Sequence, residues 1–530
     1  MEVGEYYEIA KESTVIEILR EIKSTKEAVQ NIRTGGIPPA NMRAMGVAAG
    51  DGILKVTFTE PNDTIIEEQL ICTVKGCMVR IKEGSYPEDE TDGDLVVDNT
   101  ELGKYSTQPL EITGLENEVT YYLSFFPYND QGLYNYNAAN RKAATPQTYI
   151  LYGYKINKND NNPATRITYT EMAEGMTPAY MDFEAGAFNY GSWGDAWFIT
   201  GNKPYMVKND GTVDYELNAN DYTKKLDGTA SDIANLEYNG NAMASFPLMW
   251  FKRWEDSNYE YCNICNIQLD EDYHAYAHTR QDGTIMDIKY LALFEGSYYS
   301  NKMRSLSGQV VGVSQAVTAA ITFATANGVR WYTQSFSEWA MIGDLLRLIS
   351  RNDNSQAVFG YGRGNAPSDE GAIKTGTLAT NGRFFGYSEA QSKVKAVKVF
   401  HIENFWGNVW NRIAGLMNLS GKIYIKAVPP YNTTGEGYES TNLATSGTSG
   451  GYINLTKMQA AGRIGYNAAG SETTYAADGL LFNINQNNYA MVGGSWINGP
   501  LCGASTLGLD KIIEATGTNF GGSLSCEQPA

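Results

Sequence analysis

The sequence predicts a mostly β protein with a helical N-terminal segment and a mixed α+β C-terminal part. Glycine and tyrosine are frequent, with 54 and 36 copies among 530 residues, which is typical of turn-rich β structure. Apolar residues repeat every seven positions near the N-terminus, and they alternate with polar residues in short runs between residues 43 and 146. Because 530 residues exceed what one compact core accommodates, we expect at least two domains.

A helix is predicted at residues 5–33, within a separate N-terminal part at 1–36. Two sets of positions are spaced by seven and offset by three, like the a and d positions of a heptad. They are Val15, Ile22 and Val29 in one set and Ile18, Thr25 and Ile32 in the other. β-Branched residues at both positions favour three strands, so we expect a trimeric coiled coil or an anchor to partner proteins. The alternative is a single amphipathic helix that packs on its own domain.

A small β-sandwich is predicted at residues 43–146. Turn-forming residues separate runs in which apolar and polar side chains alternate. The runs are 53–61, 78–82 and 121–126. This pattern is typical of two packed antiparallel sheets with one buried face each.

The same segment resembles fibronectin type III modules. Phe58 stands in the early strand where that family usually has tryptophan, and Leu115 precedes Tyr121 as in the family's leucine–tyrosine corner. The resemblance implies an immunoglobulin-like or fibronectin III-like β-sandwich that acts as a spacer and carries no catalysis. Cys72 and Cys77 are expected to pack there as small apolar side chains.

The remaining residues, 147–530, show no second boundary and are predicted to form one domain. An alanine-rich helix is predicted at 314–328, because Gly328 is a favourable residue after a helix end. A second helix is predicted at 335–349, where apolar residues share one face. The segment 433–451 is rich in Thr, Ser and Gly and is predicted to be an exposed loop.

Five motifs follow one another in this C-terminal part. They are FPLMWFK at 246–252, GVRWYT at 328–333 with Glu338 and Trp339 after it, SQAVFGYG at 355–362, ENFWGNVW at 403–410 and GGSW at 493–496, before a glycine-rich end at 517–522. In this order they resemble the C-type-lectin-like fold in its formylglycine-generating-enzyme variant. The resemblance is closer to bacteriophage and prophage tail or receptor-binding proteins built on that variant. It implies a C-type-lectin-like head that is held together by buried aromatic residues and glycine-rich turns.

The tryptophans of these motifs are assigned to the core of that head. They are Trp339, Trp406, Trp410 and Trp496. The alternative places one or two of them at the rim of a binding face. Asn404 and Asn408, which stand two residues before and after Trp406, are expected to bond local backbone groups.

The enzymes of this variant need two nearby cysteines after the GGS motif, to bind copper and carry out an oxidation. Here Cys502 stands alone in that region and Cys526 lies far downstream, and a single thiolate is a poor copper site. Lectins of this fold bind calcium through Glu-Pro-Asn and Trp-Asn-Asp triplets. The one Glu-Pro-Asn triplet, at residues 60–62, lies in the sandwich and is interpreted as a turn.

A Cys2His2 zinc site is conceivable from Cys262, Cys265, His274 and His278, but a reduced cysteine pair in a strand is the preferred interpretation. The chain has only three histidines, the third being His401, so general-base catalysis at neutral pH has few candidates. We therefore predict no catalytic residue, no metal ion and no cofactor. An unrecognised cell-wall or polysaccharide hydrolase is the third alternative for function.

The charge balance argues against a nucleic-acid partner. Lys and Arg number 41 and Asp and Glu number 60, which gives a net charge of −19 and no basic surface for phosphates. The sequence has no apolar run of membrane-spanning length and no signal-peptide pattern at its start, so we expect no membrane insertion and synthesis in the bacterial cytoplasm.

The resemblance implies a virion structural protein of the tail-fibre or receptor-binding type. It would bind a host surface glycan or protein, form a homotrimer and contact other virion proteins through the N-terminal helix. The alternative is a non-adhesive decoration, such as a head fibre or a collar or baseplate connector. In such heads the last strands and loops form the binding face. The residues assigned to it are Asn487, Asn488, Tyr489, Asn498 and Leu501.

Overall fold

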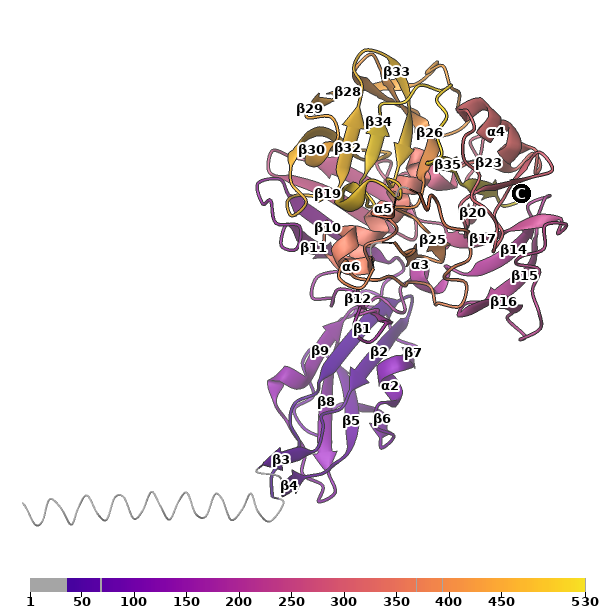
Figure 1. Ribbon diagram of the computed structural model, residues 1–530. Coiled ribbons are helices and arrows are strands. Elements are labelled where there is room, and N and C mark those ends of the chain that lie inside the picture. Colours follow the sequence, from indigo (N-terminus) through magenta and orange to yellow (C-terminus); the bar gives the residue numbers. More distant parts are fainter. Residues whose placement is uncertain (1–35, 67–68, 368, 393, 530) are drawn as a thin grey trace, which may run out of the picture. The chain divides into compact units, whose positions relative to one another are not determined.

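The computed structural model describes residues 36–529, apart from 67, 68, 368 and 393. The chain divides into two compact units, residues 1–149 and 150–530 (Figure 1). Strands hold 40% of the residues and helices 9%, so the prediction of a mostly β protein is confirmed. The predicted helix at 5–33 falls outside the described residues and stays a prediction.

The first unit consists of two antiparallel sheets with the strand orders β1-β2-β7 and β6-β5-β8-β9, together with the hairpin β3-β4 and the one-turn helix α2. The elements are β1 (Ala44–Gly50), β2 (Ile53–Thr59), β3 (Thr64–Ile66), β4 (Gln69–Cys72), β5 (Val74–Glu83), β6 (Asp94–Asn99), α2 (Lys104–Thr107), β7 (Leu110–Thr113), β8 (Tyr121–Asn129) and β9 (Arg141–Ala144). Phe58 of β2 packs on Phe125 of β8 with ring centroids 5.4 Å apart. The core therefore lies between the two sheets.

Two details of the first unit match its sequence pattern. The Tyr121 hydroxyl accepts a hydrogen bond of 3.1 Å from the Glu116 amide, which ties the start of β8 to the preceding corner. Cys72 and Cys77 are free thiols, and both are buried. They pack as small apolar side chains.

The second unit contains three large sheets. The first has the order β11-β10-β19-β18 and the second the order β16-β15-β14-β17-β20-β36-β23. Their strands are β10 (Leu151–Asn157), β11 (Ile167–Glu171), β14 (Pro204–Lys208), β15 (Val213–Asn218), β16 (Asp221–Lys225), β17 (Gly240–Pro247), β18 (Trp250–Glu255), β19 (Tyr259–Cys265), β20 (Ile288–Ala292), β23 (Trp331–Thr333) and β36 (Leu524–Glu527).

The third sheet is built from the C-terminal part of the chain, in the order β28-β27-β26-β33-β34-β32-β30-β31-β29, with β35 beside β26. Its strands are β26 (Trp410–Leu419), β27 (Lys422–Ile425), β28 (Glu439–Ala444), β29 (Ser446–Gly447), β30 (Gly451–Gln459), β31 (Gly462–Gly470), β32 (Gly479–Phe482), β33 (Asn487–Val492), β34 (Leu507–Leu509) and β35 (Phe520–Gly522). The prediction of a loop throughout 433–451 is therefore wrong, because β28 and β29 form there and pair with β27 and β31. β28 and β29 are the two edge strands of the sheet, and most of their residues are exposed.

Helix α5 (Phe336–Ser350) is buried along its whole length and contacts strands β10, β26 and β31 (Figure 1). A capping box starts it: the Ser335 hydroxyl accepts from the Glu338 amide, and the Glu338 carboxylate accepts from the Ser335 amide. The predicted alanine-rich helix is shorter than expected, α4 (Val317–Thr325), because Ala316 is still extended. Among the described residues, none of the helices is both long enough and apolar enough to cross a membrane.

Strand β36 lies between β20 and β23 and pairs with both. Leu524 and Cys526 of this strand belong to a core cluster with Trp331 and with residues of α4. A segment near the C-terminal end of the chain therefore completes a sheet whose other strands come much earlier in the sequence.

Candidate functional site

The four tryptophans of the motifs are buried in the second unit, and each residue is at most 6% exposed. They are Trp339, Trp406, Trp410 and Trp496. The Trp339 ring stacks on Phe405 at 3.9 Å, and its Nε1 donates to the Ala504 carbonyl at 3.0 Å. The Trp406 Nε1 donates to the Gly360 carbonyl at 3.2 Å. These indoles connect α5, the 404–410 turn and the loop around 504 by packing and by hydrogen bonds.

Glycine is required in these motifs because the backbones approach closely. A Cβ on Gly407, which has a φ of 79°, would lie 2.8 Å from the Arg363 carbonyl oxygen. A Cβ on Gly494, with a φ of 79°, would lie 2.7 Å from the Cys502 Sγ. Both contacts are shorter than real Cβ atoms allow, and both φ values favour glycine.

The 404–408 turn surrounds a buried carboxyl group. Asn404 and Asn408, each with a φ of 55°, both donate their side-chain amides to Glu295 Oε2, and the Val409 amide donates to Glu295 Oε1 at 3.3 Å. The expectation that the two asparagines bond local backbone groups is therefore wrong for their side-chain amides, which bond Glu295. Burial raises the pKa of Glu295 to about 8, against the hydrogen bonds that lower it.

The shifted pKa of Glu295 predicts a pH-dependent stability. The folded protein holds the Glu295 proton more tightly than the unfolded chain does. The stability that the protonated carboxyl group contributes is therefore complete below the unfolded pKa of about 4.3 and is lost as the pH rises through about 8. We expect Glu295→Gln to flatten the fall in stability between these values. Urea denaturation followed by tryptophan fluorescence, repeated across this pH range, measures it. Exposed Glu436→Gln is the control, and identical pH profiles of Glu295→Gln and wild type would contradict the prediction.

The five residues assigned to a binding face do not come together on one surface. Asn487 is exposed at the start of β33, whereas Asn488 and Tyr489 of the same strand are buried. The Asn488 amide donates to the Asn483 carbonyl at 2.8 Å, and Tyr489 packs in a core cluster. These two side chains support the strand from inside and offer no surface to a large ligand. Asn498 and Leu501, at the short helix η3 (Gly499–Leu501), are half-buried.

Beside η3 lies a surface groove of about 270 Å³. Its walls come from five separate segments of the second unit, including α6 (Ser355–Phe359) and η3. The lining residues are Phe183, Asn354, Gln356, Ala357, Tyr361, Ser388, Glu389, Glu472, Thr473 and Pro500. Pro500 lies within η3, so the groove borders the predicted 498–501 loop. The other lining residues carry no shared sequence pattern, which is why sequence reasoning missed them.

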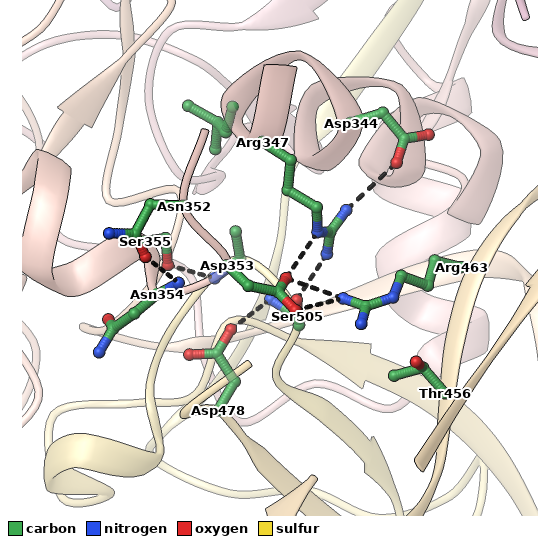
Figure 2. A network of polar contacts seen from close by, with 12 residues as sticks. Asp344, Arg347, Asn352, Asp353, Asn354, Ser355, Thr456, Arg463, Asp478 and Ser505 are labelled. Carbon is green, nitrogen blue, oxygen red and sulfur yellow. Dashed lines mark hydrogen bonds and ion pairs between the residues drawn. The ribbon is translucent and has the colours of Figure 1, made fainter. Parts of the chain in front are cut away.

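Three buried arginines converge on Asp353, the residue that precedes the groove residue Asn354. Arg166 Nη1 lies 3.0 Å from Oδ2, Arg347 Nε lies 3.0 Å from Oδ1, and Arg463 Nη1 lies 2.8 and 3.0 Å from the two oxygens. Figure 2 shows Arg347 reaching Asp353 from a helix and Arg463 from a strand. Burial raises the pKa of Asp353, but the charges of Arg463, Arg166 and Arg347 outweigh it and hold the pKa far below its usual range.

Two further buried carboxylates extend this Asp353 network, and each binds one of its arginines. Asp344 accepts from Arg347 Nη1 at 3.2 Å, from Arg253 Nε at 2.7 Å and from the Tyr154 hydroxyl at 2.8 Å, and Glu260 accepts from Arg463 Nε at 2.7 Å and from the Thr456 hydroxyl at 2.7 Å. The network thereby joins α5 to strands of two sheets, β10, β18 and β19 in one and β30 and β31 in the other. Such a cluster fixes relative positions, because any shift leaves a buried charge without its partner.

The network also holds one wall of the groove. Asn354, the residue after Asp353, lines the groove and caps α6 by accepting from the Ala357 amide at 3.0 Å. Ser355 accepts from the Ala504 amide at 3.0 Å, and Figure 2 shows Asn354 and Ser355 in the segment that follows Asp353. The groove wall at 354–361 is therefore continuous in the chain with Asp353 of the buried network.

Most of the thiol and imidazole groups, which proteins commonly use for catalysis or metal binding, are buried here. Cys262 and Cys502 are buried, and burial raises the pKa of both thiols, which keeps them protonated. His278 is fully buried, and burial lowers its pKa to about 3. Within the part of the chain that the structure describes, no group of three or more His, Cys, Asp or Glu residues is placed to hold a metal ion, so the Cys2His2 arrangement does not form.

The groove and the Asp353 network are thus the two features of the second unit that bear on ligand binding. The groove offers aromatic, amide, hydroxyl and carboxylate groups at the surface, and the network keeps one of its walls in place. No protein-family model matches the chain, and no curated protein shows significant similarity to it.

Proposed function

We propose that the chain is a virion structural protein of a tailed phage or prophage-derived particle, of the tail-fibre or receptor-binding type. Its second unit binds the host surface through the groove. The N-terminal segment joins it to other virion proteins and to two further copies, and the first unit acts as a spacer. The ordered motifs between residues 246 and 496, with their resemblance to lectin-like phage proteins, support this assignment.

The observation that carries the proposal is the combination of a small groove with a rigid support. A volume of about 270 Å³ is close to the lower end of ligand pockets, which begin at about 300 Å³. A wall that is already fixed by buried ion pairs loses little conformational entropy when a ligand binds. Phe183, which is half-buried, supplies an aromatic ring for contact, while Asn354 and Gln356 supply hydrogen-bonding groups.

Filling the groove is expected to abolish host binding. Ala357 is exposed on α6 and lines the groove, so Ala357→Arg places a long side chain there without removing any buried atom. The labelled full-length protein is incubated with a panel of bacterial strains, and bound label is counted by flow cytometry. We expect the wild type to label at least one strain and Ala357→Arg to lose most of that label.

The control is Ala326→Arg, which adds the same side chain at an exposed position after α4. It should label cells as the wild type does. Equal labelling by Ala357→Arg would remove the groove from the proposal. A wild-type protein that labels none of the strains, including the strain that carries its own prophage or supports its phage, would contradict host binding itself.

A further inference from the structure

A second, much smaller cavity lies beside the Asp353 network, between helix α5 and the third sheet. Its volume is about 20 Å³, and its lining residues are buried except Ser505, which is half-buried. Arg347 of α5 and Arg463 of β31 line it, and none of its described lining residues is a carboxylate. We propose that this cavity, which is separate from the groove, binds a single chloride ion.

Arg463 provides the observation that points to a ligand. Its Nε donates to Glu260 at 2.7 Å, and its Nη1 donates to the two oxygens of Asp353 at 2.8 and 3.0 Å (Figure 2). Its buried Nη2, in contrast, has no hydrogen-bond partner among the described residues. Because Arg463 is only 9% exposed, bulk water does not solvate this donor. A buried cationic donor without a partner is unfavourable, and an acceptor in the cavity would remove that cost.

The other arginine of the cavity is fully bonded. Arg347 donates from Nε to Asp353 at 3.0 Å, from Nη1 to Asp344 at 3.2 Å and from Nη2 to the Ser505 hydroxyl at 2.6 Å. Its position is therefore fixed, and its charge acts on the cavity without needing a further hydrogen bond. The unpartnered group of the site is thus Arg463 Nη2.

The charge balance favours an anion over a water molecule as the missing acceptor. Four arginine side chains of the network, each at most 9% exposed, share three carboxylates as ion-pair partners in the described part of the chain. The arginines are Arg166, Arg253, Arg347 and Arg463, and the carboxylates are Glu260, Asp344 and Asp353. One positive charge is therefore in excess, and water would not neutralise it.

A fourth carboxyl group, Asp478, lies close to the network but does not restore the balance. Its Oδ2 accepts from the Ser505 amide at 2.6 Å. Burial raises the pKa of Asp478 well above its usual range, which favours its protonated and neutral form. The excess positive charge thus remains inside the protein, where an anion is attracted more strongly than in water.

The size of the cavity restricts the anion. A cavity needs about 10–15 Å³ of accessible space to hold one water molecule, so about 20 Å³ admits one monatomic ion. Phosphate, sulfate and organic carboxylates have several heavy atoms and do not fit. Chloride is small enough, carries one negative charge and accepts hydrogen bonds from guanidinium groups.

Gly343 keeps this space open. It lies inside α5, where glycine is unfavourable compared with alanine. A Cβ at this position would lie 3.3 Å from Arg347 Nη1 and 3.9 Å from the Ala504 carbonyl oxygen, and both residues line the cavity. A methyl group there would therefore occupy the proposed ion site.

Chloride should stabilise the second unit by mass action, because the cavity exists only in the folded protein. The full-length protein is unfolded with urea and followed by tryptophan fluorescence, while chloride replaces gluconate at constant ionic strength. Once chloride exceeds its dissociation constant, we expect the unfolding equilibrium constant to fall about tenfold for each tenfold rise in chloride. Bromide should have the same effect. Equal unfolding constants in chloride, bromide and gluconate would overturn the inference.

Gly343→Ala should abolish the chloride dependence by filling the cavity. The matched control is Gly194→Ala at an exposed position, where the added Cβ makes an ordinary contact of 3.7 Å with the Tyr190 Cβ. This variant should keep the dependence of the wild type and also corrects for general salt effects. A full chloride dependence in Gly343→Ala would show that the ion binds elsewhere, and the inference would be wrong.

Diffraction from wild-type crystals grown in bromide locates the ion directly and does not depend on how well a variant folds. We expect an anomalous peak in the cavity, within hydrogen-bond distance of Arg463 Nη2. Bromide peaks at the surface with none in the cavity would refute the proposal, even if chloride stabilises the protein. Neither experiment involves cells, so its result is independent of host binding.

Discussion

Asp353→Ala is expected to lower the free energy of unfolding of the second unit by about 3–5 kcal/mol. The carboxylate is fully buried and is shared by Arg166, Arg347 and Arg463, so its removal leaves three buried cations without their common partner. All nine tryptophans lie in the second unit, so tryptophan fluorescence during urea denaturation reports this unit alone.

The matched control is Asp287→Ala, an exposed aspartate of the same unit, which should change stability by less than about 0.5 kcal/mol. Acid provides an independent check. Because the folded pKa of Asp353 is depressed, its contribution is complete above the unfolded pKa of about 3.9 and is lost as the pH falls below it. Asp353→Asn should therefore show a weaker loss of stability below about pH 4 than the wild type. A variant as stable as the wild type at neutral pH would contradict the structural role of the network.

Trp406→Ala is expected to cost about 3–5 kcal/mol, as large aromatic truncations in cores do. Trp406 is completely buried, and its indole N–H bonds the Gly360 carbonyl next to the groove residue Tyr361. The cavity would therefore open beside the 354–361 wall, and we expect ligand binding to weaken together with stability. Urea denaturation and cell labelling measure the two effects on the same variant.

Trp254→Ala is the control for this second variant, because Trp254 is 37% exposed and lies outside the groove lining. It should cost clearly less, since fewer apolar contacts are lost. If Trp406→Ala unfolds at the same urea concentration as Trp254→Ala, the central packing role of Trp406 is wrong.

Parts of the fold could be predicted because their signals are local. The helix expected at 335–349 is found at 336–350, since its apolar spacing and its Ser335–Glu338 capping box lie within one stretch of sequence. The alternation in β2, with every second residue buried, likewise reveals a strand with one buried face. These signals need no knowledge of distant partners.

The site could not be predicted in the same way because its signals are not local. Arg166 and Asp353 are separated by 187 positions, and charged residues are expected at the surface unless a buried partner is known. Asn488 and Tyr489 resemble surface residues in the sequence, because the polar start Asn-Asn-Tyr is typical of an exposed loop. In the structure β33 lies between β26 and β34, and its residues from Asn488 to Val492 are buried.

The position of β36 has a consequence for biosynthesis. While a ribosome is still adding residues before 524, β20 and β23 already exist but each lacks its shared neighbour. Unpaired strand edges of this kind pair with other chains and promote aggregation. A polypeptide interrupted before residue 524 would thus expose strand edges that the finished chain covers with β36.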